Sequence, residues 1–137
     1  MTDAAPVVVG CDVVDVARMR RLLDERPGAR SRLFSDRELT DAVRGGVDPE
    51  GPIALERLAA RFAAKEATRK ALGGLGPTLT SIEVRTDDDG APSVWIDGVP
   101  TRLACPLSHD AGVAMAVVVG DGSARDDVLG RRATDVR

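Results

Sequence analysis

Positions 61–73 of the sequence are Arg61-Phe62-Ala63-Ala64-Lys65-Glu66-Ala67-Thr68-Arg69-Lys70-Ala71-Leu72-Gly73. This stretch predicts the C-terminal half of a helix that begins near Ile53 and stops at Gly73, because glycine is common just past a helix end. At about 3.6 residues per turn, one stripe of that helix collects six side chains: Leu55, Ala59, Phe62, Ala63, Glu66 and Lys70. The stripe is apolar until Glu66, so we expect a carboxylate on an inward face, where it needs a partner or a bound cation.

Two explanations of Glu66 follow from this pattern. Lys70, one turn further on, is placed to form a structural ion pair with it, or the two side chains belong to a functional site. All but two of the chain's 19 basic residues are arginine, and the exceptions, Lys65 and Lys70, both lie near Glu66. A compact ammonium differs from a flat guanidinium in what it can contact, so this placement favours the functional explanation.

The composition limits the class of protein. The 137 residues, 43% of them apolar and 30% charged, fit one globular domain. A net charge of −3, a single Trp and no Tyr argue against nucleic acid as the main partner. We find no membrane-spanning run and no signal peptide at the N-terminus, and expect a cytoplasmic protein. Cys11, Cys105 and the single His109 lack zinc-site spacing, so we expect two buried thiols.

Local patterns predict an α+β domain over residues 1–120: a strand, three helices, then several antiparallel strands. The first strand covers Val7–Val14, and a helix follows to about Glu25. Ser35 to Glu38 matches a capping box and starts a second helix that ends near Arg44. The long helix comes next, and further strands are expected at 81–85, 93–97, 100–107 and 111–119, the first two joined by a turn at 87–90. Residues 121–137 are polar and predict a loose tail.

Asp12 lies at the end of the apolar first strand, where an acid either caps the next helix or takes part in a site. Glu66 is the second candidate acid. If the two carboxylates converge, they suit Mg²⁺, which binds few protein ligands and keeps water or phosphate oxygens. Spacing in the sequence does not establish that they converge.

Three further features are candidates for binding. His109 follows Ser108 on a strand, where neighbours point to opposite faces, so Ser108 cannot use His109 as a base, and His109 is better suited to donate a hydrogen bond to a phosphate. Gly73, in a glycine-rich turn after the Lys70 helix, is either a helix cap or a place where backbone approaches a ligand. The basic first helix, with Arg18 and Arg21, is either a solvated face or a docking surface for an acidic partner.

Together these residues resemble one known family, the holo-acyl-carrier-protein synthases, which are small stand-alone 4′-phosphopantetheinyl transferases. The resemblance covers about residues 7–119 and rests on motifs in the family's order and spacing: Val9-Gly10-Cys11-Asp12-Val13-Val14, Phe34-Ser35-Asp36-Arg37-Glu38-Leu39, the stretch from Arg61 to Gly73, Gly90-Ala91-Pro92 and Leu107-Ser108-His109.

This resemblance implies Mg²⁺-dependent transfer of the phosphopantetheine arm of coenzyme A to a serine of an apo acyl carrier protein, leaving adenosine 3′,5′-bisphosphate. It implies four catalytic residues: Asp12, Glu66, Lys70 and His109, of which Asp12 and Glu66 hold the metal. It implies coenzyme A contacts from Arg61, Lys70, Gly73, Ser108 and His109, and docking of an acidic carrier protein on Arg18 and Arg21. The family also implies a homotrimer with sites at subunit interfaces.

Two other functions use part of the same residue set. A metal-dependent phosphohydrolase acting on a nucleotide-like pyrophosphate would need the two acids and Lys70. A carrier-protein-binding subunit without catalysis would need only the basic helix, so the complete set of Asp12, Glu66, Lys70 and His109 argues against it.

Overall fold

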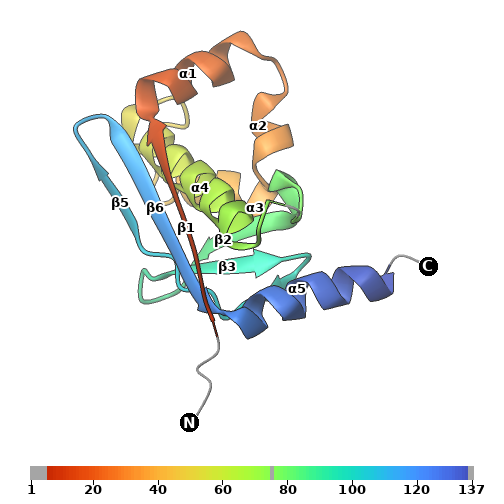
Figure 1. Cartoon of the computed structure of the whole chain (residues 1–137). Helices are drawn as coiled ribbons and strands as arrows, with labels where there is room; N and C mark the ends of the chain where they lie inside the picture. The colour runs from red at the N-terminus through yellow and green to blue at the C-terminus, as the bar shows by residue number, and fades with distance from the viewer. Residues whose placement is uncertain (1–5, 75, 136–137) are drawn as a thin grey trace.

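The computed structural model describes residues 6–74 and 76–135, and within them the long helix α4 (Pro52–Ala71) is the central element. It lies beside an antiparallel sheet with strand order β1 (Val7–Asp15), β6 (Val113–Asp121) and β5 (Leu107–Asp110). Figure 1 shows α4 running alongside this sheet, where it contacts β1 and β6. The α+β architecture expected from the sequence is confirmed.

Helix α4 can lie directly on β1 because the residues at their contact are small. A Cβ atom added to Gly10 would lie 1.9 Å from the carbonyl oxygen of Ala67, so no other residue fits there without moving the helix. On the helix side, Ala63 and Ala67 are fully buried. This close approach brings the second half of β1, with Asp12, beside the C-terminal half of α4.

Three shorter helices precede α4: α1 (Val16–Glu25), α2 (Ala29–Leu33) and α3 (Asp36–Ala42). The predicted capping box is confirmed, because Ser35 Oγ accepts the N–H of Glu38 while the Glu38 carboxylate accepts the N–H of Ser35. Helix α3 ends at Ala42, short of the predicted Arg44. The five-residue α2 was not predicted; it is too short to show helical periodicity.

A second antiparallel sheet contains β2 (Ile82–Thr86), β3 (Pro92–Ile96) and β4 (Val99–Pro100), and a single turn of 3₁₀ helix (Leu79–Ser81) precedes it. The hairpin around residues 87–90 is confirmed, with the Gly90 N–H bonded to the Asp87 carbonyl. The strand predicted at 100–107 is wrong. Only Pro100 and Leu107 of that range belong to strands, because Pro100 and Pro106 lack the N–H that a continuous ladder needs.

The expected loose tail is also wrong, because helix α5 (Gly122–Asp135) occupies most of it. Asp121 Oδ1 accepts the backbone N–H groups of Ser123 and Ala124 at 2.9 and 3.3 Å, which satisfies donors at the start of the helix. Ala124 and Val128, one turn apart, are buried. Two apolar anchors in a polar segment give too weak a periodicity to predict a helix. Residues 136 and 137 lie outside the described part.

Strands β1 and β6 bury one face against α4 and expose the other, which we call the outer sheet face. It carries six exposed apolar side chains: Val7, Val9, Val13, Val113, Met115 and Val119. Cys11 is exposed on the same face, so the expectation of two buried thiols holds only for Cys105. Burial raises the pKa of the Cys105 thiol to about 12.

In the described residues, no helix combines the length and the apolar character needed to cross a membrane. Of the N-terminal segment 1–6, expected not to be a signal peptide, residues 1–5 lie outside the described part.

Candidate active site

The two predicted acids line one cleft of about 410 Å³ between β1, α1 and α4. Asp12 comes from β1 and Glu66 from α4, and Asp15 at the end of β1 and Arg18 of α1 form the rest of the polar wall. Apolar side chains, among them Met19 and Phe62, line the remainder. The convergence that the sequence left open therefore occurs: carboxylates 54 positions apart face the same cavity.

Lys70 lies beside the cleft and is paired with Asp12. Its Nζ is 3.1 Å from Asp12 Oδ1 and donates to the backbone carbonyl of Cys11 at 3.0 Å. The hydrogen bond that Lys70 donates to Asp12, together with the negative charge of that carboxylate, raises the pKa of Lys70. Because its side chain is more than half exposed, the ammonium can also reach a ligand in solvent.

Glu66 has a different partner from the one suggested by the helix stripe. Glu66 forms an ion pair with Arg69, whose Nη1 is 3.7 Å from Glu66 Oε1, whereas Lys70 pairs with Asp12. The structural Glu66–Lys70 pair considered from the sequence is thus not the arrangement observed. A 3.7 Å contact to an arginine leaves the Glu66 oxygens accessible to a cation in the cleft.

Lys65, the other lysine beside Glu66, is turned away from the cleft. Its side chain is fully buried and paired with Glu38 of α3. The two lysines therefore have different surroundings, one inside the protein and one at the edge of the site.

The donor set suits magnesium better than a metal that needs a full protein cage. Within residues 6–74 and 76–135 there is no group of three or more His, Cys, Asp or Glu placed to hold a metal ion. Two carboxylates that face an open cleft match the preference of Mg²⁺ for one or two protein carboxylates plus water and phosphate oxygens. The residues present fit that ion.

His109 lies in a separate pocket of about 260 Å³, together with Glu56 at the start of α4. Its Nδ1 is 3.7 Å from Glu56 Oε2. In the sheet, His109 stands opposite Ala114, and Ala114 in turn stands opposite Val14 of β1. One chain thus brings Asp12, Glu66 and Lys70 together, but not His109.

Ser108 is paired with Met115 in the sheet, and Met115 belongs to the outer sheet face. His109 is paired with the buried Ala114 on the opposite face. The two neighbours therefore point to opposite sides of β5, as expected, and do not form a catalytic pair.

Arg61 does not face the cleft. It is almost fully buried, and its guanidinium donates to Thr86 Oγ1 at 3.0 Å and to the Arg57 carbonyl at 3.2 Å. Desolvation by this burial lowers the pKa of Arg61. Gly73, by contrast, is exposed just past α4 with a φ of 83°, a conformation that favours glycine. Leu75 of the same turn lies outside the described residues.

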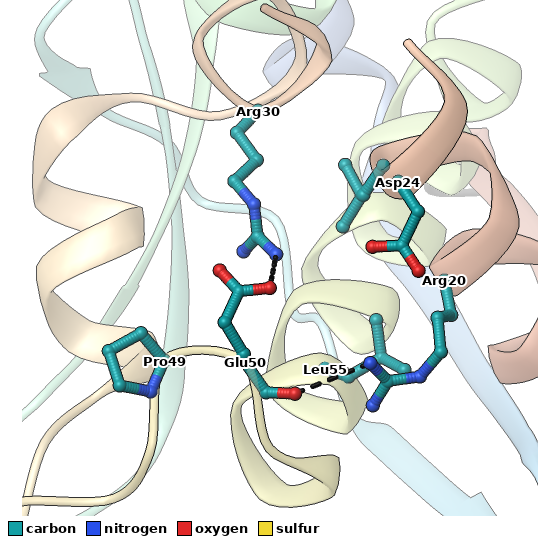
Figure 2. A pocket seen from close by; sticks show the side chains of 7 residues that line it. Arg20, Asp24, Arg30, Pro49, Glu50 and Leu55 are labelled. Carbon is teal, nitrogen blue, oxygen red and sulfur yellow. Dashed lines mark hydrogen bonds and ion pairs between the residues drawn. The ribbon is translucent and has the colours of Figure 1, made fainter. Parts of the chain in front are cut away.

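Two of the arginines of α1 are exposed, whereas a third holds the loop before α4. Arg18 and Arg21 are open to solvent. Figure 2 shows the third, Arg20, donating to the backbone carbonyl of Glu50 at 3.3 Å, while Arg30 of α2 binds the Glu50 carboxylate at 3.1 Å. These contacts fix α1 and its exposed arginines relative to α4.

No local pattern indicates that Glu56 lies beside His109. The two residues are far apart in the chain, and only the packing of α4 against the sheet brings them together. A charged side chain in the first turns of a helix is common and by itself indicates nothing.

Comparison with known proteins identifies the class. Residues 8–118 match the model of the 4′-phosphopantetheinyl transferase superfamily. Over 126 aligned residues the chain is 42% identical to a holo-[acyl-carrier-protein] synthase of Streptomyces avermitilis, with 83% of this chain and 96% of the relative covered. A synthase of Clavibacter michiganensis is also 42% identical, with 85% and 96% covered.

Similar solved structures belong to the same class of enzyme. A Bacillus anthracis holo-(acyl-carrier-protein) synthase in complex with CoA (3′,5′-ADP) has a TM-score of 0.70 and 34% identity, covering 85% of this chain and 96% of that one. A Helicobacter pylori synthase in complex with coenzyme A has a TM-score of 0.65 and 26% identity, covering 80% and 96%.

The chain therefore belongs to the 4′-phosphopantetheinyl transferase superfamily. Within it, the similarity is to the holo-[acyl-carrier-protein] synthases, and the chain is an enzyme of that kind.

Proposed function

We propose that this chain transfers the 4′-phosphopantetheine group of coenzyme A to a serine of an apo acyl carrier protein, in a Mg²⁺-dependent reaction in the cytoplasm. The observation that supports this most is the convergence of Asp12 and Glu66 on one cleft, with Lys70 paired to Asp12 at its edge. In the transfer, the serine hydroxyl gives up its proton, its oxygen bonds to the phosphorus that carries pantetheine, and the bond from that phosphorus to the bridging oxygen of the pyrophosphate breaks. Adenosine 3′,5′-bisphosphate leaves.

Phosphoryl transfer needs charge neutralisation and positioning more than covalent help from the protein. Asp12 and Glu66 would hold Mg²⁺, which supplies positive charge to the pyrophosphate oxygens. Lys70 would bind the same pyrophosphate, because its raised pKa keeps the ammonium charged and its side chain is exposed. The carrier serine is the nucleophile.

We assign the missing His109 to a neighbouring copy of the chain in a homotrimer. The outer sheet face exposes a contiguous set of valines and Met115, and clustered apolar side chains of this kind are typical of a protein–protein interface. His109 and the cleft acids do not meet within one chain, so a second copy would complete the proposed residue set. Ser108 lies on the outer face itself and would reach coenzyme A from the interface.

The carrier protein would dock on α1. Arg18 and Arg21 are exposed on this helix, and Arg18 also lines the cleft, so an acidic surface bound there would bring its serine close to Asp12 and Glu66. Charge complementarity of this kind favours fast and selective association.

The first test is the intact mass of an apo acyl carrier protein after incubation with the chain, coenzyme A and Mg²⁺. The proposal predicts a gain of one phosphopantetheine that chelation of the metal abolishes. Cleavage of coenzyme A without modification of any carrier in a panel would instead support the phosphohydrolase.

The shared site has its own test in mixtures of two inactive variants, Glu66→Gln and His109→Ala. In a closed ring, about one quarter of the interface sites in an equal mixture would combine the intact Glu66 of one chain with the intact His109 of another. We therefore expect activity to reappear after the two variants are unfolded and refolded together. A mixture as inactive as its components would show that each chain uses its own His109.

A further inference from the structure

Helix α5, which lies outside the residues matched by the family model, is fixed to the body of the domain on two of its faces. Arg102 donates to Ser123 Oγ at 2.6 Å and pairs with Asp127 Oδ2 at 2.9 Å, one helical turn apart. Ala124 and Val128 are buried on the neighbouring face. These contacts set the rotation of α5, and therefore the direction in which Arg125 points.

Arg125 points to the C-terminal end of α4. A Cβ atom added to Gly73 would lie 2.7 Å from Arg125 Nη2 and 3.2 Å from its Cζ, so the guanidinium is in contact with the glycine Cα. Gly73 in turn donates its N–H to the Lys70 carbonyl at 3.1 Å. Arg125 therefore lies one turn beyond the lysine of the active site.

The basic side chains near this turn differ in whether they have an acidic partner. Lys70 is paired with Asp12 and Arg69 with Glu66. Within residues 6–74 and 76–130, whose side chains the structure describes, no hydrogen bond or ion pair to Arg125 is found. Three carbonyls of the last turn of α4 already have backbone donors, since those of Thr68, Arg69 and Lys70 accept the N–H groups of residues 72, 74 and 73. Against the described side chains, Arg125 thus adds a positive charge without an acidic partner.

We propose that Arg125 binds a phosphate group of coenzyme A, so that helix α5 forms part of the substrate site. The proposal rests on the proposed function, in which Lys70 binds the pyrophosphate of the same molecule. A guanidinium offers planar paired donors that match phosphate oxygens. Coenzyme A carries a pyrophosphate and a 3′-phosphate, and either could be the group bound.

The test compares wild type with Arg125→Gln in the full-length chain. Coenzyme A binding is measured by calorimetry and the Michaelis constants of both substrates from initial rates. We expect the dissociation constant and Michaelis constant for coenzyme A to rise about tenfold, as for loss of one charge-assisted hydrogen bond. The Michaelis constant for the carrier protein should stay the same. Arg125→Lys keeps the positive charge but lacks the paired donors of a guanidinium. Its affinity for coenzyme A should lie between those of wild type and Arg125→Gln.

Arg37→Gln serves as the matched control, because Arg37 is an exposed arginine on α3 whose recorded partner is Asp41 at 4.0 Å. It should leave coenzyme A affinity unchanged. Coenzyme A lacking its 3′-phosphate identifies the group bound. Equal affinity of wild type and Arg125→Gln for that analogue points to the 3′-phosphate, and a persistent difference points to the pyrophosphate.

Unchanged coenzyme A affinity in Arg125→Gln, with only a lower melting temperature, would overturn the proposal and leave Arg125 as a stabiliser of the α4 C-terminus. Failure of the wild type itself to bind coenzyme A would reject the proposed function as well, so the two failures are distinct.

Discussion

Lys65 and Glu38 form an ion pair inside the protein, with both side chains at 0% exposure. Each partner makes further hydrogen bonds. Lys65 Nζ donates to the Leu33 carbonyl at 2.7 Å, and the Glu38 carboxylate accepts the backbone N–H groups of Ser35 and Val84 at 2.9 and 3.0 Å. The pair therefore joins α3, α4, β2 and the end of α2. By holding Lys65 in the interior, it sets the rotation of α4 about its axis, and this rotation directs the next residue, Glu66, toward the cleft.

Breaking this pair should destabilise the fold strongly. In Glu38→Ala, Lys65 loses its counter-ion and two backbone N–H groups lose their acceptor. We expect a loss of about 3–5 kcal/mol in the free energy of unfolding, measured by urea denaturation. Lys65→Met should cost less, because the remaining Glu38 carboxylate keeps both of its backbone N–H donors. Equal, small losses in both variants would show that the pair is not important for stability.

Glu66→Gln should abolish transfer while leaving the fold intact. The amide keeps the volume of the side chain but not the charge that a divalent cation requires. Activity is followed by the mass gain of the carrier protein, and folding by thermal melting. Asp88→Asn, an equivalent change at an exposed acid in the β2–β3 turn, is the control and should remain fully active. Near-normal transfer by Glu66→Gln would remove Glu66 from the site.

Arg21→Glu should weaken the carrier protein's interaction and leave coenzyme A affinity as it is. Reversing one exposed charge on α1 opposes an acidic partner, so the Michaelis constant for the carrier should rise about tenfold at low salt and less at high salt. Arg37→Glu on α3 provides the same charge change away from the proposed docking helix. If the two variants have the same carrier Michaelis constant, Arg21 is a bystander.

The contact between Lys70 and Asp12 gives a pH dependence whose direction follows from the raised pKa of Lys70. Because the pKa is higher in the folded than in the unfolded chain, the stabilising contribution is complete below the ordinary value of 10.5 and is lost as the pH rises through the folded value. Lys70→Gln should therefore melt below wild type at pH 8, and the gap should close in strongly alkaline solution. A gap that stays constant across this range would mean that the ammonium does not contribute through its charge.

The two cysteines should report separately on the core and on the outer sheet face. Cys105 is buried with a pKa of about 12, so it should resist iodoacetamide at pH 8 until the protein unfolds. Cys11 lies on the outer sheet face, which the proposed trimer covers. It should be protected in wild type and become reactive in Met115→Glu, a variant expected to be monomeric by light scattering. Rapid labelling of Cys11 in wild type would argue against a covered outer face.

Much of the fold follows from local patterns. The apolar β-branched run predicts β1, the Ser35–Glu38 box predicts the start of α3, and Gly73 marks the end of the long helix, all of which the structure confirms. The errors fall where local signals are weak. Helix α2 has five residues, the two prolines interrupt a strand, and α5 is held by only two buried apolar side chains.

By itself, the sequence determined the helix with Glu66 and Lys70, the strand with Asp12 and the kind of chemistry these residues support, because periodicity and side-chain type are local properties. Only the tertiary structure decided which residues meet. The absence of a side chain at Gly10 lets α4 lie on β1, and that approach brings Asp12 to Lys70 and to the cleft of Glu66. The tertiary structure also decided that Lys65 lies in the interior, that His109 lies beside Glu56 and that Arg125 lies against Gly73. Each of these contacts joins segments that are distant in the chain.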